Sequence, residues 1–204
     1  MFAVTFTANR DSRWLYEILQ FLFNHIEELN QTEFANQFKD FLEKMAVRYA
    51  KERLFTEDKS IKKYGAIPVY AFNFVDYVLW KNREELKKDY DIEFKDFKFA
   101  YRRSIEHWYP QNPNGHDGES QLPAEFLHSF GNLCIITDSQ NSRFGNSYPE
   151  AKLEQWEREG IFHRQSLKLQ MMAKITSKKN RWDIGEIQSM EKEVERYVQN
   201  FCNS

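Results

Sequence analysis

The sequence SIEHWYPQ, at residues 104–111, is followed by GNLCIITDSQNSRFGNSYPEAK at residues 131–152. Residues 97–105 carry Phe, Phe, Tyr, Arg and Ile at every second position, and a period of two is typical of a β-strand. Residues 132–137 (NLCIIT) form an apolar run that predicts a short buried strand, and the residues after it have helical spacing. Together these segments predict a strand, a loop, a strand and a helix over residues 97–160.

Apolar residues at helical spacing flank this segment on both sides. The predicted helices cover residues 9–30, 33–53, 69–88, 162–175 and 183–200. We therefore expect an α+β fold that is mostly helical, with a ββα motif inside it. The expected regions are an N-terminal helical region (1–96), a ββα core (97–160) and C-terminal helices that pack on that core (161–204).

The composition is that of a folded protein. Of the 204 residues 41% are hydrophobic, which excludes wholesale disorder, and the net charge of −2 excludes a protein that holds nucleic acid by bulk charge alone. Two cysteines, Cys134 and Cys202, cannot form a disulfide framework, and the absence of a CxxC pair argues against a structural zinc. No segment is apolar over the ~20 residues that a membrane span needs, so we expect no membrane association and a cytoplasmic location.

Glu106 and His107 end the first predicted strand and face a helix start that is rich in Asn. Hydrolysis of a phosphodiester needs a base for the attacking water, and a neutral imidazole suits that task near neutral pH. It also needs a hard divalent cation beside the scissile phosphate, and Mg²⁺ or Mn²⁺ prefers carboxylate and amide oxygens. His107 is thus a candidate base, and Glu106 and Asn141 are candidate ligands of a single metal ion.

These motifs resemble the HNH branch of the His-Me finger (ββα-metal) nucleases, and most closely the C-terminal nuclease domain of GmrSD-type modification-dependent restriction enzymes. In that family an [ED]H-x-x-P-Q motif ends the first strand, a G-N-L motif opens the second, and an N-S/N-x motif starts the helix. Here they read EHWYPQ (106–111), GNL (131–133) and NS (141–142), with Asn146 just beyond. The pattern from Trp182 to Ile187 also resembles the family.

The resemblance implies a role for each matching residue. His107 corresponds to the general base, Glu106 to the acidic metal ligand, and Asn132 to the residue whose side chain braces the loop and orients the histidine. Asn141 corresponds to the metal ligand on the helix, with Asn146 as the alternative. The implied function is a Mg²⁺- or Mn²⁺-dependent DNA endonuclease in a setting of phage restriction.

Proteins of the GmrSD type begin with a ParB/sulfiredoxin-like domain that hydrolyses nucleotides, and we find neither that domain nor a P-loop in this sequence. We therefore expect the chain to be a fragment, a stand-alone nuclease half, or the partner of a separate NTP-hydrolysing subunit. Cutting both DNA strands would favour a homodimer, because one chain carries one site.

Basic residues near these motifs are candidates for contact with DNA phosphates. Arg102 and Arg103 lie close to His107 in the sequence, and residues 160–182 are basic without any acidic residue. The candidates in that stretch are Arg164, Lys168, Lys174, Lys178, Lys179 and Arg181. The alternative is an ordinary solvated helix face.

Each assignment has a plainer alternative. His107 is then a core histidine and Glu106 a solvated strand residue. Asn132 is a residue that terminates a turn after Gly131, and Asn141 is a helix N-cap. His116 and Asp117, a second His–acid pair in the turn-rich segment 111–123, we interpret as polar loop residues. For the whole chain, the alternative function is a catalytically silent DNA-binding or interaction module that keeps the fold.

Overall fold

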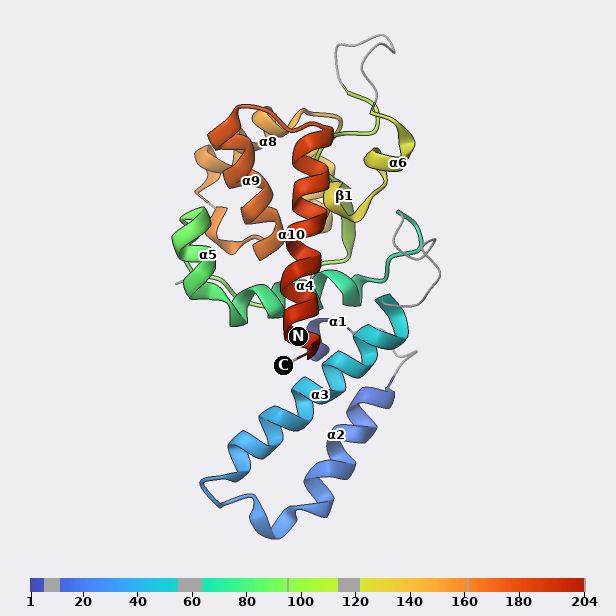
Figure 1. Ribbon diagram of the computed structural model, residues 1–204, viewed down its shortest axis with the longest axis vertical. Coiled ribbons are helices and arrows are strands. Elements are labelled where there is room, and N and C mark those ends of the chain that lie inside the picture. The colour runs from blue at the N-terminus through green and yellow to red at the C-terminus, as the bar shows by residue number, and fades with distance from the viewer. Residues whose placement is uncertain (6–11, 55–63, 95, 114–121, 161, 204) are drawn as a thin grey trace.

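The computed structural model describes the whole chain except residues 6–11, 55–63, 95, 114–121, 161 and 204. Helices surround one small sheet (Figure 1), so the expectation of a mostly helical α+β chain is confirmed. In chain order the elements are α1 (Phe2–Thr5), α2 (Arg13–Asn24), the 3-10 helix η1 (Ile26–Glu28), α3 (Phe34–Leu54), α4 (Val69–Lys81), α5 (Arg83–Tyr90), β1 (Ser104–His107), α6 (Ala124–Leu127), η3 (Phe130–Asn132), β2 (Leu133–Ile136), α7 (Asp138–Phe144), α8 (Pro149–Glu159), η4 (Phe162–Arg164), α9 (Leu167–Lys179) and α10 (Ile184–Asn203).

The sheet consists of β1 and β2, paired antiparallel with Ser104 opposite Ile136. The prediction of a strand from residue 97 onward is wrong for residues 97–103, which form no ladder. A strand needs a partner, and β2 is only four residues long, so it can pair only the last part of the alternating segment. Phe97 packs half-buried against the main core, so its apolar character reflects loop packing.

Helix α4 forms the centre of the core. Nine of its 13 residues are buried, as expected of a helix that is apolar on nearly every side. It packs against α9 and β2, and β2 is buried along its whole length. The predicted helix 69–88 is in fact two helices, because Asn82 ends α4 and begins α5. The main core cluster includes residues from β2, α4, α8, α9 and α10, so the sheet is held from several sides.

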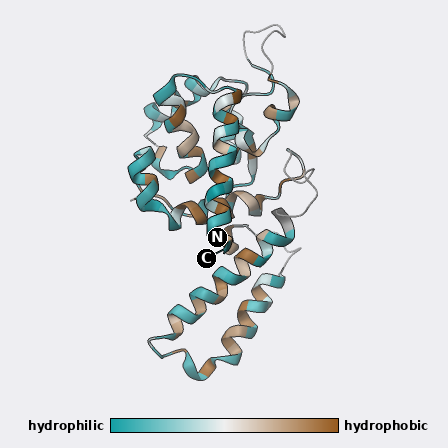
Figure 2. Cartoon of the chain, in the orientation of Figure 1, coloured by the Kyte–Doolittle hydropathy of each residue, from teal (hydrophilic) through white to brown (hydrophobic). Residues whose placement is uncertain are grey.

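Helices α2 and α3 form a hairpin that extends away from the other elements (Figure 1). The rings of Phe21 and Phe41 stack between them with centroids 4.2 Å apart. Helix α2 contains many hydrophobic residues (Figure 2), and Leu19 and Phe23 within it and Ile26 just beyond its end are exposed. In the part of the chain that the structure describes, no helix is both long and apolar enough to cross a membrane.

Candidate active site

The acid–histidine pair lies at the end of β1. Glu106 is opposite Cys134 and His107 is opposite Leu133 in the antiparallel ladder. Both side chains are largely buried, with 9% of Glu106 and 4% of His107 exposed. Glu106 is therefore not the solvated strand residue of the plainer interpretation.

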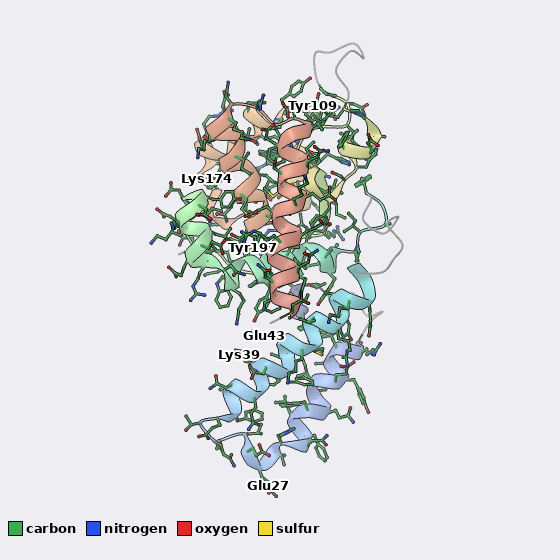
Figure 3. All side chains as sticks on the ribbon, in the orientation of Figure 1. Glu27, Lys39, Glu43, Tyr109, Lys174 and Tyr197 are labelled. Atoms are coloured by element: carbon green, nitrogen blue, oxygen red, sulfur yellow. The ribbon has the colours of Figure 1, made fainter. Side chains whose placement is uncertain are left out.

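Asn132 is fully buried and uses both ends of its amide. Its Nδ2 donates to the carbonyl oxygens of Tyr109 (3.1 Å) and Leu127 (3.0 Å), and its Oδ1 accepts from the Tyr109 amide (2.8 Å) and the Trp182 indole (3.1 Å). Its backbone oxygen accepts from the Trp108 amide at 2.8 Å. Figure 3 shows Tyr109 at the end of the molecule opposite the α2–α3 hairpin. These contacts tie the segment after β1 to Asn132, which is the geometry that a bracing role requires.

The residue before Asn132 is a glycine, Gly131, because α10 leaves no room for a side chain at that position. A Cβ atom at Gly131 would lie 2.1 Å from the carbonyl oxygen of Ile187, far inside van der Waals contact. Leu133, the third residue of the GNL motif, is fully buried in β2. The GNL motif and the pattern from Trp182 to Ile187 therefore meet at one place, where α10 packs on η3.

His107 contacts a second histidine. Its Nε2 lies 3.0 Å from Nδ1 of His128, and the ring of Tyr64 meets it edge-on with centroids 4.4 Å apart. The Tyr64 amide also donates to the carbonyl oxygen of His128 at 3.1 Å. Burial, and then the nearby His128 and Lys152, lower the pKa of His107 to about 4. The imidazole is therefore neutral at neutral pH, which is the form that a general base needs.

Lys152 lies in the first turn of α8 and is fully buried. Its Nζ donates to Oε1 of Glu106 at 2.7 Å, to the carbonyl oxygen of His107 at 2.7 Å and to that of Trp108 at 3.0 Å. Burial lowers the pKa of Lys152, and the charge and hydrogen bond of Glu106 act against that shift. The carboxylate of Glu106 is thus paired with a cation from within the chain.

Two residues of this cluster, Lys152 and His128, did not emerge from the sequence as site residues. The signal for Lys152 is its spacing, because Pro149, Lys152 and Trp156 are the buried residues of α8 and recur at intervals of three and four. His128 sits 21 residues beyond His107, and only the hairpin that β1 and β2 form brings the two together.

Asn141 and Asn146 do not join this cluster by any described hydrogen bond. Helix α7 is capped by Thr137, in a capping box with Gln140, so Asn141 is not its N-cap. Asn141 is exposed in the middle of α7, and Asn146 is exposed just after it. The structure therefore brings together Glu106, His107 and Asn132, and leaves the two candidate ligands on the surface near the strands.

The donor set fits a divalent cation only in part. Within the described ranges, no three His, Cys, Asp or Glu side chains gather where they could hold a metal ion. Oε1 of Glu106 is occupied by Lys152, which leaves Oε2 and amide oxygens as the hard donors that Mg²⁺ prefers. His116 and Asp117 lie outside the described residues.

Two of the residues expected to contact DNA are instead buried. Arg102 is 3% exposed and donates to the carbonyl oxygen of Arg164 at 2.5 Å. Lys168 is fully buried, and its ammonium donates to the carbonyl oxygens of Phe130, at 2.8 Å, and Leu133. A phosphate group cannot reach either cation from solvent, so both serve the fold.

The other basic candidates reach solvent. Arg103 is exposed and pairs with Asp138 at 2.6 Å. Lys174 is half-buried, and Arg164, Lys178, Lys179 and Arg181 are exposed. Arg181 directly precedes Trp182, whose indole binds Asn132, so the end of α9 lies beside the segment that carries the histidine.

Comparison with protein families finds one match. The family model described as the C-terminal domain of GmrSD restriction endonucleases matches residues 55–194. Comparisons with curated proteins and with solved structures return no match. The matched range contains β1, β2, α7 and α8, and therefore the whole of the cluster around His107.

Proposed function

Because the chain belongs to the family of C-terminal domains of GmrSD restriction endonucleases, we propose that it is a metal-dependent DNA endonuclease of the HNH type, with His107 as its general base. One observation supports this most strongly. A neutral, buried imidazole ends β1 beside an acid, and the segment after it is braced by Asn132. Restriction of modified or phage DNA is the biological setting that the family suggests.

In the proposed reaction the imidazole of His107 takes a proton from a water molecule whose oxygen attacks phosphorus. The bond from phosphorus to the 3′-oxygen breaks, and the departing oxygen takes a proton from solvent. In the chain without DNA, the imidazole of His107 contacts the rings of Tyr64 and His128. Binding of DNA has to move one of these rings before the base reaches the attacking water.

A Mg²⁺ or Mn²⁺ ion would neutralise charge on the scissile phosphate. The residues proposed to hold it are Glu106, through Oε2, and Asn141, with Asn146 as the alternative. Mg²⁺ commonly takes only one or two protein ligands and completes its shell with water and substrate phosphate. Two protein ligands would therefore be enough, although Glu106 offers only Oε2.

The proposed partner is DNA, contacted by the exposed basic residues at the end of α9. A separate ParB-like, NTP-hydrolysing subunit is a further proposed partner, by analogy with whole proteins of the GmrSD type. A homodimer is proposed for cutting both strands, since one chain carries one candidate base.

Plasmid cleavage tests the proposal. Wild type, His107→Ala and the control His163→Ala would be compared on unmodified and base-modified plasmid with Mg²⁺, Mn²⁺ or EDTA. His163 is an exposed histidine in η4 and makes a matched control. Loss of the base should lower the rate by roughly 10²–10⁴-fold, with DNA affinity retained and His163→Ala unaffected.

Equal cleavage by His107→Ala and wild type would remove His107 from the role of base. If wild type binds DNA in a salt-dependent way but cleaves neither plasmid, with the metals and with an NTP-hydrolysing partner added, the catalytically silent module becomes the better account.

A further inference from the structure

The ammonium group of Lys152 occupies an unusual place. It is fully buried, yet it lies in the first turn of α8, where the helix dipole disfavours a positive charge. Burying an ion pair seldom improves stability over well-packed apolar residues of the same volume. Stability alone therefore does not explain why a lysine occupies this position.

The three hydrogens of the ammonium all find acceptors, and those acceptors belong to three consecutive residues. They are Oε1 of Glu106 and the carbonyl oxygens of His107 and Trp108. The rings of Trp108 and Phe144 close the sides, with centroids 5.6 Å and 5.7 Å from Nζ. An ammonium has three donors, so every donor of Lys152 binds the last two residues of β1 or the residue that follows them.

We propose that Lys152 is the resident cation of the site and positions His107 by clamping the two peptide groups that follow it. This inference rests on the proposed function, because the position of the His107 ring affects the reaction only if His107 acts as the base. Lys152 is a positioning residue, since its ammonium touches the backbone of the base and not the substrate.

The geometry of the two peptide groups supports the clamp. In the first, the carbonyl of His107 binds Lys152 while the amide of Trp108 binds the backbone oxygen of Asn132. In the second, the carbonyl of Trp108 binds Lys152 while the amide of Tyr109 binds Oδ1 of Asn132. Each peptide group is thus held at both ends, by Lys152 on one side and Asn132 on the other.

The clamp also limits the carboxylate. Because Lys152 holds Oε1 of Glu106, only Oε2 remains for a metal ion, and the rotation of the carboxylate is restricted. Removing the ammonium should therefore change both the orientation of His107 and the affinity of the site for a divalent cation.

Lys168 provides a matched control. It is also a fully buried lysine whose ammonium binds two backbone carbonyls, but those belong to Phe130 and Leu133. A variant Lys168→Met thus reports the general cost of losing a buried ammonium. Lys152→Met reports the same loss at the backbone of the base.

The first arm of the experiment needs no catalysis. Long-range ¹H–¹⁵N spectra of the histidine rings would be recorded at pH 8 for the full chain without metal, as wild type, Lys152→Met and Lys168→Met. We expect the ring signals of His107 to move or broaden in Lys152→Met, and to move much less in Lys168→Met, whose ammonium holds the ladder partner Leu133 instead of His107 itself. Wild-type His107 signals in a folded Lys152→Met would overturn the proposal.

The second arm measures cleavage and metal binding. A misplaced base should lower kcat by about 10²-fold, while KM for DNA changes little because Lys152 is not exposed to DNA. The affinity of the same variants for Mn²⁺ is followed by the electron paramagnetic resonance signal of the ion. This affinity should differ from that of wild type in Lys152→Met only. An equal fall of kcat in Lys168→Met, or unchanged Mn²⁺ affinity in Lys152→Met, would contradict the clamp.

If Lys152→Met does not fold, the double variant Glu106→Gln with Lys152→Met removes both buried charges, and the two carbonyls remain unclamped. Displaced His107 signals in that variant support the proposal, and wild-type signals overturn it. If wild type does not cleave DNA, the proposed function fails, and the spectra of the first arm still decide the clamp.

Discussion

Acidification should destabilise the folded chain through His107. Burial lowers its pKa from 6.5 to about 4. Between these two values the unfolded chain takes up a proton that the folded chain does not, so stability is lost as the pH falls from 6.5 towards 4. At 1.36 kcal/mol per pH unit, the loss assigned to this one residue is about 3 kcal/mol.

Urea unfolding at pH 7, 6, 5 and 4 measures this loss, with the fluorescence of the buried Trp108, Trp156 and Trp182 as the signal. Other groups titrate in the same range, among them Asp76, whose pKa burial raises to about 6. We therefore compare wild type with His107→Gln, in which these other contributions cancel. The variant should lose about 3 kcal/mol less than wild type between pH 7 and pH 4. Parallel pH profiles for the two proteins would show that folding does not lower the pKa of His107.

Three further perturbations test the packing and the surface around the site. Gly131→Ala should destabilise the chain by about 3 kcal/mol or more, because its Cβ would overlap the backbone of α10; chemical unfolding measures this, and a loss below 1 kcal/mol would contradict the close approach. Trp182→Phe removes one hydrogen bond to Asn132 and should cost about 1 kcal/mol in the same assay; a neutral result would show that this bond adds no stability. The double variant Lys178→Gln with Arg181→Gln should bind DNA more weakly and reduce the slope of log affinity against log salt by about 2; an unchanged slope would remove the end of α9 from the DNA-binding surface.

Local pattern in the sequence was a good guide to the order of the elements. A two-residue period, an apolar run and helical spacing predicted strand, strand and helix in the right order around Glu106 and His107. The extent of β1 could not be predicted, because it depends on the length of its partner β2. Alternation of side chains indicates that a segment can pair, and only the fold determines how much of it does.

The charge of a side chain was the least reliable predictor of whether that side chain lies at the surface or in the core. Lys152 and Lys168 are both fully buried, although a lysine in a helix is ordinarily expected at the surface. Each is held by carbonyl oxygens that lie far from it in the sequence, and no local pattern contains those partners. Asn132 could be assigned its bracing role in advance only because the GNL motif is shared with a known family.

The role of His107 as general base is tested most directly by chemical rescue of His107→Gly. The side chain that this variant lacks is 4% exposed in the folded protein, so its removal leaves a space in which free imidazole can bind. If His107 is the general base, the folded variant should cleave plasmid DNA roughly 10²–10⁴-fold more slowly than wild type, and the rate should rise and saturate as imidazole is added. A folded variant that cleaves DNA at the wild-type rate without imidazole, or that is not accelerated at any imidazole concentration, would show that His107 is not the general base.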